Sequence, residues 1–364
     1  MQRDGALYYW DYLQLDRLLA CQRLESAAHG EPAHDEMLFI VVHQAFELWF
    51  KQIIWEIDAV RQVMARDVVA DRDMSQVVAR LDRVTAIQPL LIHQLEVLET
   101  MTPLDFLDFR DHLVPASGFQ SVQFRLIENK LGIDPDHRMR IGGAAYTAAL
   151  SDEHADLLRR SEQQPSLLAH VERWLQRTPF LHFGTFDFWR AYRQTVADLL
   201  DRERAVIERN PNLGEHERQE QLANHAKTRD TFAALFDTGR WEEQRAEGRR
   251  RLSHEAFLAA LLINLYRDEP VFHMPFRLLT ALVEIDEGFT AWRQRHALMV
   301  HRMIGGKIGT GGTTGHRYLQ ATSDQHRVFR DLFDLSTFLV PRSALPQLPP
   351  EVTEQMQFRY AGAG

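Results

Sequence analysis

The most constraining feature of this 364-residue sequence is a helix-like stretch that runs directly into a glycine-rich segment. Trp292, His296, Met299 and Met303 recur at three- and four-residue steps, the spacing of one face of an α-helix. Six glycines follow between 305 and 315, which predicts positive φ angles or a close approach by another group. The phosphate-loop pattern GxxxxGK[ST] does not occur, so a nucleotide cradle is not expected. We expect a helix with one functional histidine, followed by a loop that closes over a small ligand.

The segment WRQRHALMVHRMIGGKIGTGGTTG resembles the haem-ligand helix and substrate loop of the tryptophan 2,3-dioxygenase family. That family normally has GTGGSSG; Thr313 and Thr314 keep the hydroxyl groups and add methyl groups. Further blocks resemble the family in the same order, from Tyr9 to about Pro341. The resemblance implies insertion of both atoms of O₂ across the indole C2–C3 bond of L-tryptophan. The product would be N-formyl-L-kynurenine, at the first step of tryptophan degradation by the kynurenine pathway.

Charge and cysteine content restrict the partners and the compartment. The sequence has 42 basic and 51 acidic residues, a net charge of −9, which disfavours binding to nucleic acids and to anionic membranes. Cys21 is the only cysteine, so an intrachain disulfide is excluded and a reducing compartment fits. The N-terminal residues lack the apolar core of a signal peptide, and polar residues interrupt the apolar stretch Met37–Ile57. We therefore expect a cytoplasmic protein without a membrane span.

Helical periodicity recurs along the chain, without internal repeats or βαβ alternation. The expected architecture is a single all-α domain over residues 1–364, a helical bundle that, by the resemblance, encloses a haem. Three parts are distinguished within it: a helical arm at 1–22, a charged helical excursion at 195–250 and a loose proline-rich tail at 341–364.

Aromatic residues of the arm share one face of the predicted helix Tyr8–Gln22. Tyr9, Tyr12 and Leu13 lie at positions i, i+3 and i+4. On the sequence alone, this face docks onto the core of its own chain. In the resembled family the same segment lines the substrate pocket of a neighbouring subunit, which implies a homotetramer, a dimer of dimers, with a shared active site.

The segment His34–Val63 is apolar almost all round, as expected of a central helix enclosed by others. One of its stripes contains Phe39, His43, Phe46 and Phe50. A lone histidine on such a stripe is commonly a satisfied core residue. The resemblance implies instead that Phe39 packs on the substrate and that His43 faces the indole nitrogen above the haem. Because an indole N–H is a poor acid, His43 is expected to position the substrate rather than to be an obligatory base.

A second block begins at Thr102, an expected N-cap followed by proline and then by an acid at the third helical position. The helix places Phe106 and Arg110 four residues apart. A routine ion pair with a neighbouring aspartate is the structural alternative for Arg110. The resemblance implies that Arg110 binds the substrate carboxylate and that Phe106 packs beside it. Ser117 fits a capping box for the next helix, and the resemblance implies a haem contact for it.

His296 is the candidate axial ligand of the haem iron, with Trp292 one turn earlier on the same face. From spacing alone, a helical histidine is more often structural; the family block favours the ligand. The implied cofactor is one haem b per chain, with O₂ as co-substrate. Thr310, on the glycine-rich loop, is the implied acceptor for the substrate ammonium group. Three alternatives stay open: an indole oxygenase acting on a modified tryptophan, a non-catalytic haem sensor, and a helical scaffold without cofactor.

Overall fold

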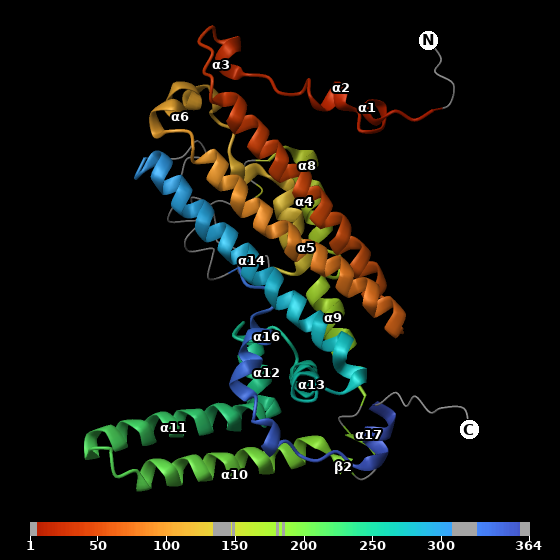
Figure 1. The fold of residues 1–364 in the computed structure, drawn as a ribbon, viewed down its shortest axis with the longest axis vertical. Helices are drawn as coiled ribbons and strands as arrows, with labels where there is room; N and C mark the ends of the chain where they lie inside the picture. Colours follow the sequence, from red (N-terminus) through yellow and green to blue (C-terminus); the bar gives the residue numbers. More distant parts are fainter. Residues whose placement is uncertain are drawn as a thin grey trace. The chain divides into compact units, whose positions relative to one another are not determined.

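The computed structural model describes residues 6–133, 147, 150–179, 182–183, 186–307 and 326–356. The chain divides into two compact units (Figure 1): the first is Met1–Glu56, Val84–Gln164 and Glu287–His326, and the second is Ile57–Arg83, Pro165–Asp286 and Arg327–Gly364. Within the described ranges every element is helical apart from one pair of two-residue strands, which confirms the all-α class. A single domain stays a prediction.

The first unit is built around parts of three long helices, with shorter helices that follow the same chain segments. Its elements are α1 (Tyr9–Tyr12), α2 (Leu15–Leu18), α3 (Glu25–Ala28), most of α4 (Glu36–Met64), the second half of α5 (Asp71–Leu98), α6 (Pro103–Arg110), η1 (Asp111–Leu113), η2 (Gly118–Gln120), α7 (Val122–Leu131), α8 (Asp152–Glu162) and the second half of α14 (His273–Ile304).

The second unit contains the remaining parts of α4, α5 and α14. Its other elements are α9 (Leu167–Leu175), β1 (His182–Phe183), β2 (Phe186–Asp187), α10 (Phe188–Arg209), α11 (Glu215–Leu235), α12 (Thr238–Ala246), α13 (His254–Leu265), η4 (Pro270–Phe272), α16 (Arg330–Asp334), η5 (Leu335–Phe338), η6 (Arg342–Ala344) and α17 (Pro350–Met356). The strands are antiparallel and pair His182 with Asp187 and Phe183 with Phe186.

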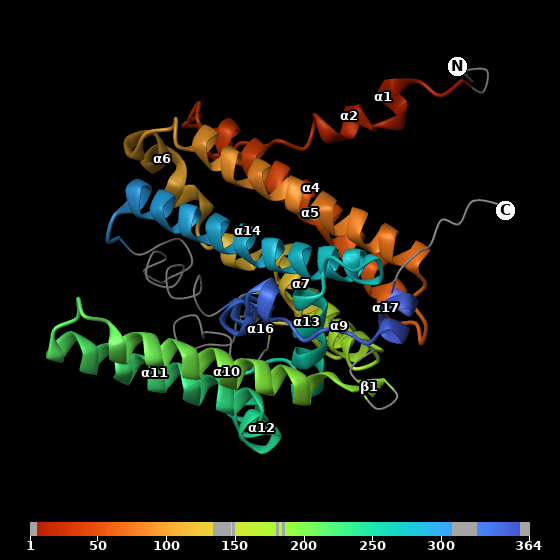
Figure 2. The same ribbon diagram turned by 60° about the horizontal axis from the view of Figure 1, so that its bottom comes forward.

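Helices α5 and α14 run parallel, and Figures 1 and 2 both draw α4 alongside them. Arg295 of α14 donates a hydrogen bond to Glu99, the residue that follows the end of α5. The two helices therefore remain side by side as far as the end of α5. Between Gly288 and Gln88 they approach closely: a Cβ at residue 288 would lie 2.2 Å from the Gln88 side-chain oxygen. Glycine at this position therefore leaves room for the Gln88 side-chain amide between the two helices.

Helix α4 has one buried and one exposed apolar face. Phe46 and Phe50 are buried, whereas Leu48 and Trp55 are exposed, Trp55 to 73%. The expectation of a helix enclosed on all sides is therefore wrong. When a helix is apolar on all sides, the sequence does not indicate which of its faces the rest of the chain covers. Among the described helices, α4 alone is long and apolar enough to cross a membrane, a property that core helices of soluble proteins share.

The N-terminal arm is not the continuous helix that the spacing predicts. Gln14 adopts a left-handed conformation (φ 51°), which separates α1 from α2. Tyr9 and Tyr12 are exposed to 75% and 67%. The expected docking of these aromatic rings onto the core of their own chain is therefore not observed.

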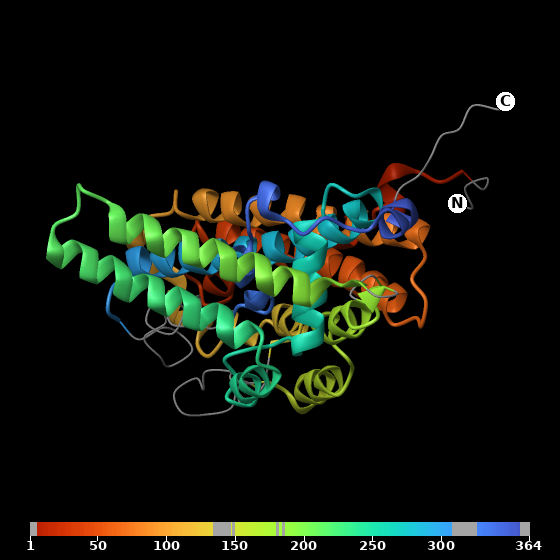
Figure 3. The ribbon, with the colours of Figure 1, turned by 90° about the horizontal axis from the view of Figure 1, so that it is seen from below.

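The charged excursion forms the predicted helical hairpin, in which α10 and α11 lie side by side (Figures 1 and 3). Its turn lies at 210–214, and its base is anchored in the core by Tyr192 of α10 and Leu235 of α11, both fully buried. The tail differs from the loose segment that its prolines predicted. Through residue 356 it is ordered by α17, whose Val352 and Met356 are buried.

Candidate active site

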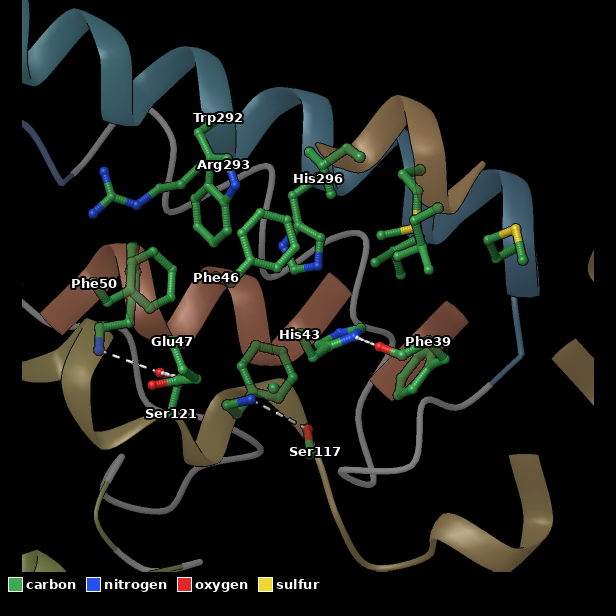
Figure 4. Close-up of a pocket in the computed structure, with 18 of the residues that line it drawn as sticks. Phe39, His43, Phe46, Glu47, Phe50, Ser117, Ser121, Trp292, Arg293 and His296 are labelled. Atoms are coloured by element: carbon green, nitrogen blue, oxygen red, sulfur yellow. Dashed lines mark hydrogen bonds between the residues drawn. The ribbon is translucent and has the colours of Figure 1, made fainter. Parts of the chain in front are cut away.

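A cavity of about 250 Å³ lies within the first unit, between α4 and α14, with the middle and end of α6 and the η2–α7 segment completing its walls. Figure 4 shows Trp292 and His296 pointing from α14 toward Phe46 and His43 of α4. Seven of the residues singled out in the sequence line it together: Phe39, His43, Phe106, Arg110, Ser117, Trp292 and His296. The cavity therefore collects residues from segments far apart in the sequence.

His43 is held in one tautomer by its own helix. Its Nδ1 lies 2.7 Å from the carbonyl oxygen of Phe39, one turn earlier. Because a carbonyl oxygen only accepts, Nδ1 carries the proton and Nε2 keeps a lone pair. Burial lowers the pKa of His43, against smaller opposing effects of the Phe39 bond and of Glu47. His43 is therefore a neutral hydrogen-bond acceptor.

His296 is a second neutral imidazole in the same cavity. Burial, with a smaller contribution from His43, lowers the pKa of His296 to about 4. Its ring stacks on Trp292 at 5.2 Å between centroids and 24° between planes. Within the described part of the chain, His296 Nδ1 and Trp292 Nε1 are buried without a hydrogen-bond partner. Such groups are costly to bury alone, which favours a ligand or water in the complete site.

Aromatic rings form the wall between these histidines. Trp292 contacts Phe46, Phe50 and Phe124 at centroid distances of 6.0, 5.9 and 5.0 Å. The two phenylalanines of α4 meet the indole edge-on, a favourable geometry for aromatic pairs. The middle of the cavity is thus apolar and suits a flat, largely apolar ligand.

Arg110 lies in the last turn of α6, and a capping box fixes the start of this helix. Thr102 accepts from Asp105 N, and Asp105 accepts from Thr102 N at 2.8 Å, which confirms the predicted helix start. Phe106 stacks on Phe39 at 5.7 Å, so α6 is tied to α4 beside His43. Arg110 is half-buried on the cavity wall.

Ser117 forms the predicted capping box with Gln120, but the box opens the short η2 turn rather than α7. Helix α7 begins at Val122 and is capped by Ser121 instead. Ser121 also donates to Glu47 at 2.6 Å, and this bond ties α7 to α4.

A buried charged cluster at one end of the cavity was not predicted. Glu128 of α7 accepts from Arg125 at 2.9 Å and from Arg293 of α14 at 3.0 Å. His326 Nδ1 lies 3.1 Å from Glu128 as well. All four side chains are buried and line the cavity. The local signal was an Arg–Glu pair three residues apart, which also describes an ordinary exposed helix.

The other predicted site residues lie elsewhere. Tyr9, Tyr12 and Leu13 are exposed and do not line the cavity. Thr310 lies outside the described residues, as do Thr313 and Thr314.

Comparison with known proteins places the whole chain in one group. A family model described as tryptophan 2,3-dioxygenase matches residues 1–339. A tryptophan 2,3-dioxygenase of Bdellovibrio bacteriovorus is 47% identical over 354 residues, which cover 97% of this chain and 99% of that protein. The Xenopus laevis protein of that name is 50% identical over 350 residues, or 96% of this chain and 86% of its own. The Mus musculus protein is 47% identical over 348 residues, or 95% and 85%.

Proposed function

This chain belongs to the tryptophan 2,3-dioxygenase family, and from that premise we propose that it oxidises L-tryptophan with O₂. Both oxygen atoms enter the indole C2–C3 bond, which is cleaved to give N-formyl-L-kynurenine. The observation that carries the proposal is a single cavity faced by two neutral imidazoles, His43 and His296, with Arg110 on its wall.

The proposed cofactor is one haem b per chain, whose iron His296 would bind, with Trp292 and Ser117 as further residues that would contact it. The residues fit this group, because a neutral imidazole is a common haem ligand and His296 is held neutral by burial. The aromatic wall and the unpartnered Trp292 Nε1 suit a flat ligand with polar edges. A bound ferrous haem supplies the iron at which O₂ is activated.

The substrate zwitterion needs a partner for each charge, because burying an unpaired charge is costly. The Arg110 guanidinium can donate two parallel hydrogen bonds to the carboxylate. Thr310 is the proposed acceptor for the ammonium group. Phe39 and Phe106, already stacked on each other, form the wall for the indole ring.

His43 orients the indole. Its Nδ1–H is occupied by Phe39, so the free lone pair on Nε2 can accept the indole N–H. That bond holds the indole edge in a fixed direction without transferring a proton. His43 thus acts in catalysis as a substrate-positioning acceptor.

We also propose a cytoplasmic homotetramer, a dimer of dimers, in which the arm of one chain completes the pocket of another. Two exposed apolar surfaces support this: the arm with Tyr9, Tyr12 and Leu13, and the outer face of α4 with Leu48 and Trp55. No nucleic-acid or membrane partner is proposed, in keeping with the net charge of −9.

Complementation tests the shared site. One inactive chain carries Arg110→Ala with an intact arm; the other carries Tyr9→Ala and Tyr12→Ala with an intact cavity. Co-assembled chains should regain part of the activity, because some intact cavities receive an intact arm. Mixed oligomers, verified by two different tags, that stay inactive would show that each chain completes its own pocket.

The activity is tested on the purified protein with reductant, O₂ and L-tryptophan, by following the absorbance band of N-formylkynurenine. We expect product formation that depends on both tryptophan and O₂. A haem spectrum without tryptophan-dependent O₂ uptake would point to a sensor. Faster turnover of ring-substituted tryptophans than of tryptophan itself would point to a different indole substrate.

A further inference from the structure

At the charged end of the cavity, one buried polar atom has no hydrogen-bond partner among the described residues. Glu128 is the shared acceptor for Arg125, Arg293 and His326, at 2.9 to 3.1 Å. His326 Nε2, on the opposite edge of that ring, is buried and has no hydrogen-bond partner within the described residues. His326 as a whole is 3% exposed, and it lines the cavity. A buried imidazole nitrogen without a partner beside a cavity points to a ligand group there.

Arg293 is placed to serve the same ligand group. Its guanidinium donates to Glu128 through one nitrogen and, at 3.5 Å, to the backbone oxygen of His326 through another. It lies over the Phe124 ring, 5.4 Å from the centroid. A guanidinium has five N–H groups, and these contacts use two of them. Arg293 also directly follows Trp292, and Trp292 Nε1 is a further buried atom without a hydrogen-bond partner among the described residues.

The cavity also has apolar lining residues, among them Leu95, Leu98, Met101, Met299 and Met303. A ligand that fits this lining has an apolar part and an acidic part. The guanidinium groups of Arg125 and Arg293 share one carboxylate, so a negative charge on the ligand complements this cluster.

We propose that Arg293, held in place by Glu128 and by the backbone oxygen of His326, forms the seat for a carboxylate group of the haem. The inference rests on the proposed haem function and adds the residues that select the dicarboxylate form of the porphyrin. Arg293 lies three residues before His296 on α14, so the iron ligand and the seat belong to one rigid helix. Glu128 acts as a positioning residue: it accepts from Arg293 and orients the guanidinium.

The test measures the rate at which the holoprotein loses its porphyrin to excess apomyoglobin, followed by absorbance, without any measurement of activity. The chain is loaded either with haem or with haem dimethyl ester, whose carboxylates are blocked. The unchanged chain should lose the ester roughly 10- to 100-fold faster than haem, the range for a hydrogen bond to a charged group. Equal loss rates would overturn the seat, and this comparison needs no variant that has to fold.

Variants assign the effect to residues. In Arg293→Gln, haem should be lost about as fast as its ester, because the mutation and the esterification remove the same contact and their effects do not add. Arg293→Lys should restore part of the preference, since it keeps the charge without the planar fork. The matched control is Arg302→Gln on the same helix, an exposed arginine that does not line the cavity, which should keep the full preference.

The outcomes separate the two proposals. A chain that takes up no haem at all overturns the proposed function. A chain that takes up haem but does not distinguish it from the ester overturns the seat alone. An Arg293→Gln variant that still prefers haem over the ester as strongly as the unchanged chain also overturns it.

Discussion

Two regions of this molecule are rich in charge and treat it in opposite ways. In the hairpin of α10 and α11, pairs such as Arg204–Glu208 and Arg229–Asp201 lie at the surface with both partners about half exposed or more. At the end of the cavity, the side chains of Glu128 and Arg293 are exposed to only 2% and 6%. The first set of charges stays in water and the second has been removed from it.

The exposed pairs of the hairpin are explained by solvation, whereas the buried cluster needs another explanation. Exposed ion pairs gain little, because water and salt screen them. A buried pair loses its hydration, and apolar residues of the same volume often serve stability equally well. A cluster that keeps buried charge next to unpartnered polar atoms is therefore better explained by a ligand than by the fold. Variants that remove charges or ligand-facing groups from each region test this contrast.

Removal of the proposed iron ligand should have the largest effect. His296→Ala takes away the neutral imidazole, and we expect the variant to lose normal haem retention. The measurement is haem content and the Soret spectrum of the purified protein. His301→Ala, an exposed histidine on the same helix, is the control and should keep both. An unchanged Soret band in His296→Ala would rule out this ligand.

Breaking the buried cluster should strongly destabilise the fold. Glu128→Ala leaves Arg293 and Arg125 buried without the carboxylate that they share, and we expect a loss of about 3–5 kcal/mol in the free energy of unfolding. Urea unfolding of the haem-free protein measures this loss without the contribution of the ligand. A loss below about 1 kcal/mol would place the cluster with the weak surface pairs.

Arg110 tests a pocket charge that is meant for a substrate. Arg110→Ala should raise KM for L-tryptophan roughly 10- to 100-fold, because a charge-assisted pair with the carboxylate is lost. Arg110→Lys should recover only part of this. Tryptamine, which has no carboxylate, should be affected much less. Equal losses for tryptophan and tryptamine would refute the assignment.

His170 of α9 gives a smaller, pH-dependent effect. Burial, followed by the nearby charges of Arg173 and Arg61, lowers the pKa of His170 below its ordinary value of 6.5. The unfolded chain then binds more protons below pH 6.5, so this contribution to stability is complete above that pH and is lost on acidification. Unfolding curves at pH 7.5 and 5.5 should show a smaller difference for His170→Gln than for the unchanged chain. An identical difference would contradict the shift.

The hairpin should show the smallest effect. Arg204→Ala removes an exposed partner of Glu208, and we expect the thermal unfolding midpoint to stay within experimental error. The same variant should keep normal haem content. A clear fall in the midpoint would mean that exposed pairs contribute here as buried ones do, and the contrast between the two regions would fail.

Local rules predicted much of this molecule from the sequence. The helix with Trp292 and His296, the cap at Thr102 and the charged hairpin follow from periodicity, capping and turn residues, and the structure confirms all three. Each of these signals is contained within a few residues of the element that it describes.

Contacts between distant segments were beyond those rules. Glu128 meets Arg293 and His326 across 165 and 198 residues, and in the sequence it is only one acid near an arginine. The exposed face of α4 was missed for a similar reason, since the covering of a face depends on the rest of the chain. The break at Gln14 could not be predicted, because Gln14 adopts a left-handed conformation that glycine or asparagine usually adopts.

The close approach of Gly288 to Gln88 couples the packing of α14 to the position of His296. Gly288 and His296 are eight residues apart on one uninterrupted helix, a rise of about 12 Å. A methyl group at 288 would press on the Gln88 side chain, which is buried and has little room to retreat. A sideways displacement of α14 at residue 288 would also move the His296 imidazole. A substitution at 288 would thereby disturb the proposed iron ligand, although Gly288 does not line the cavity.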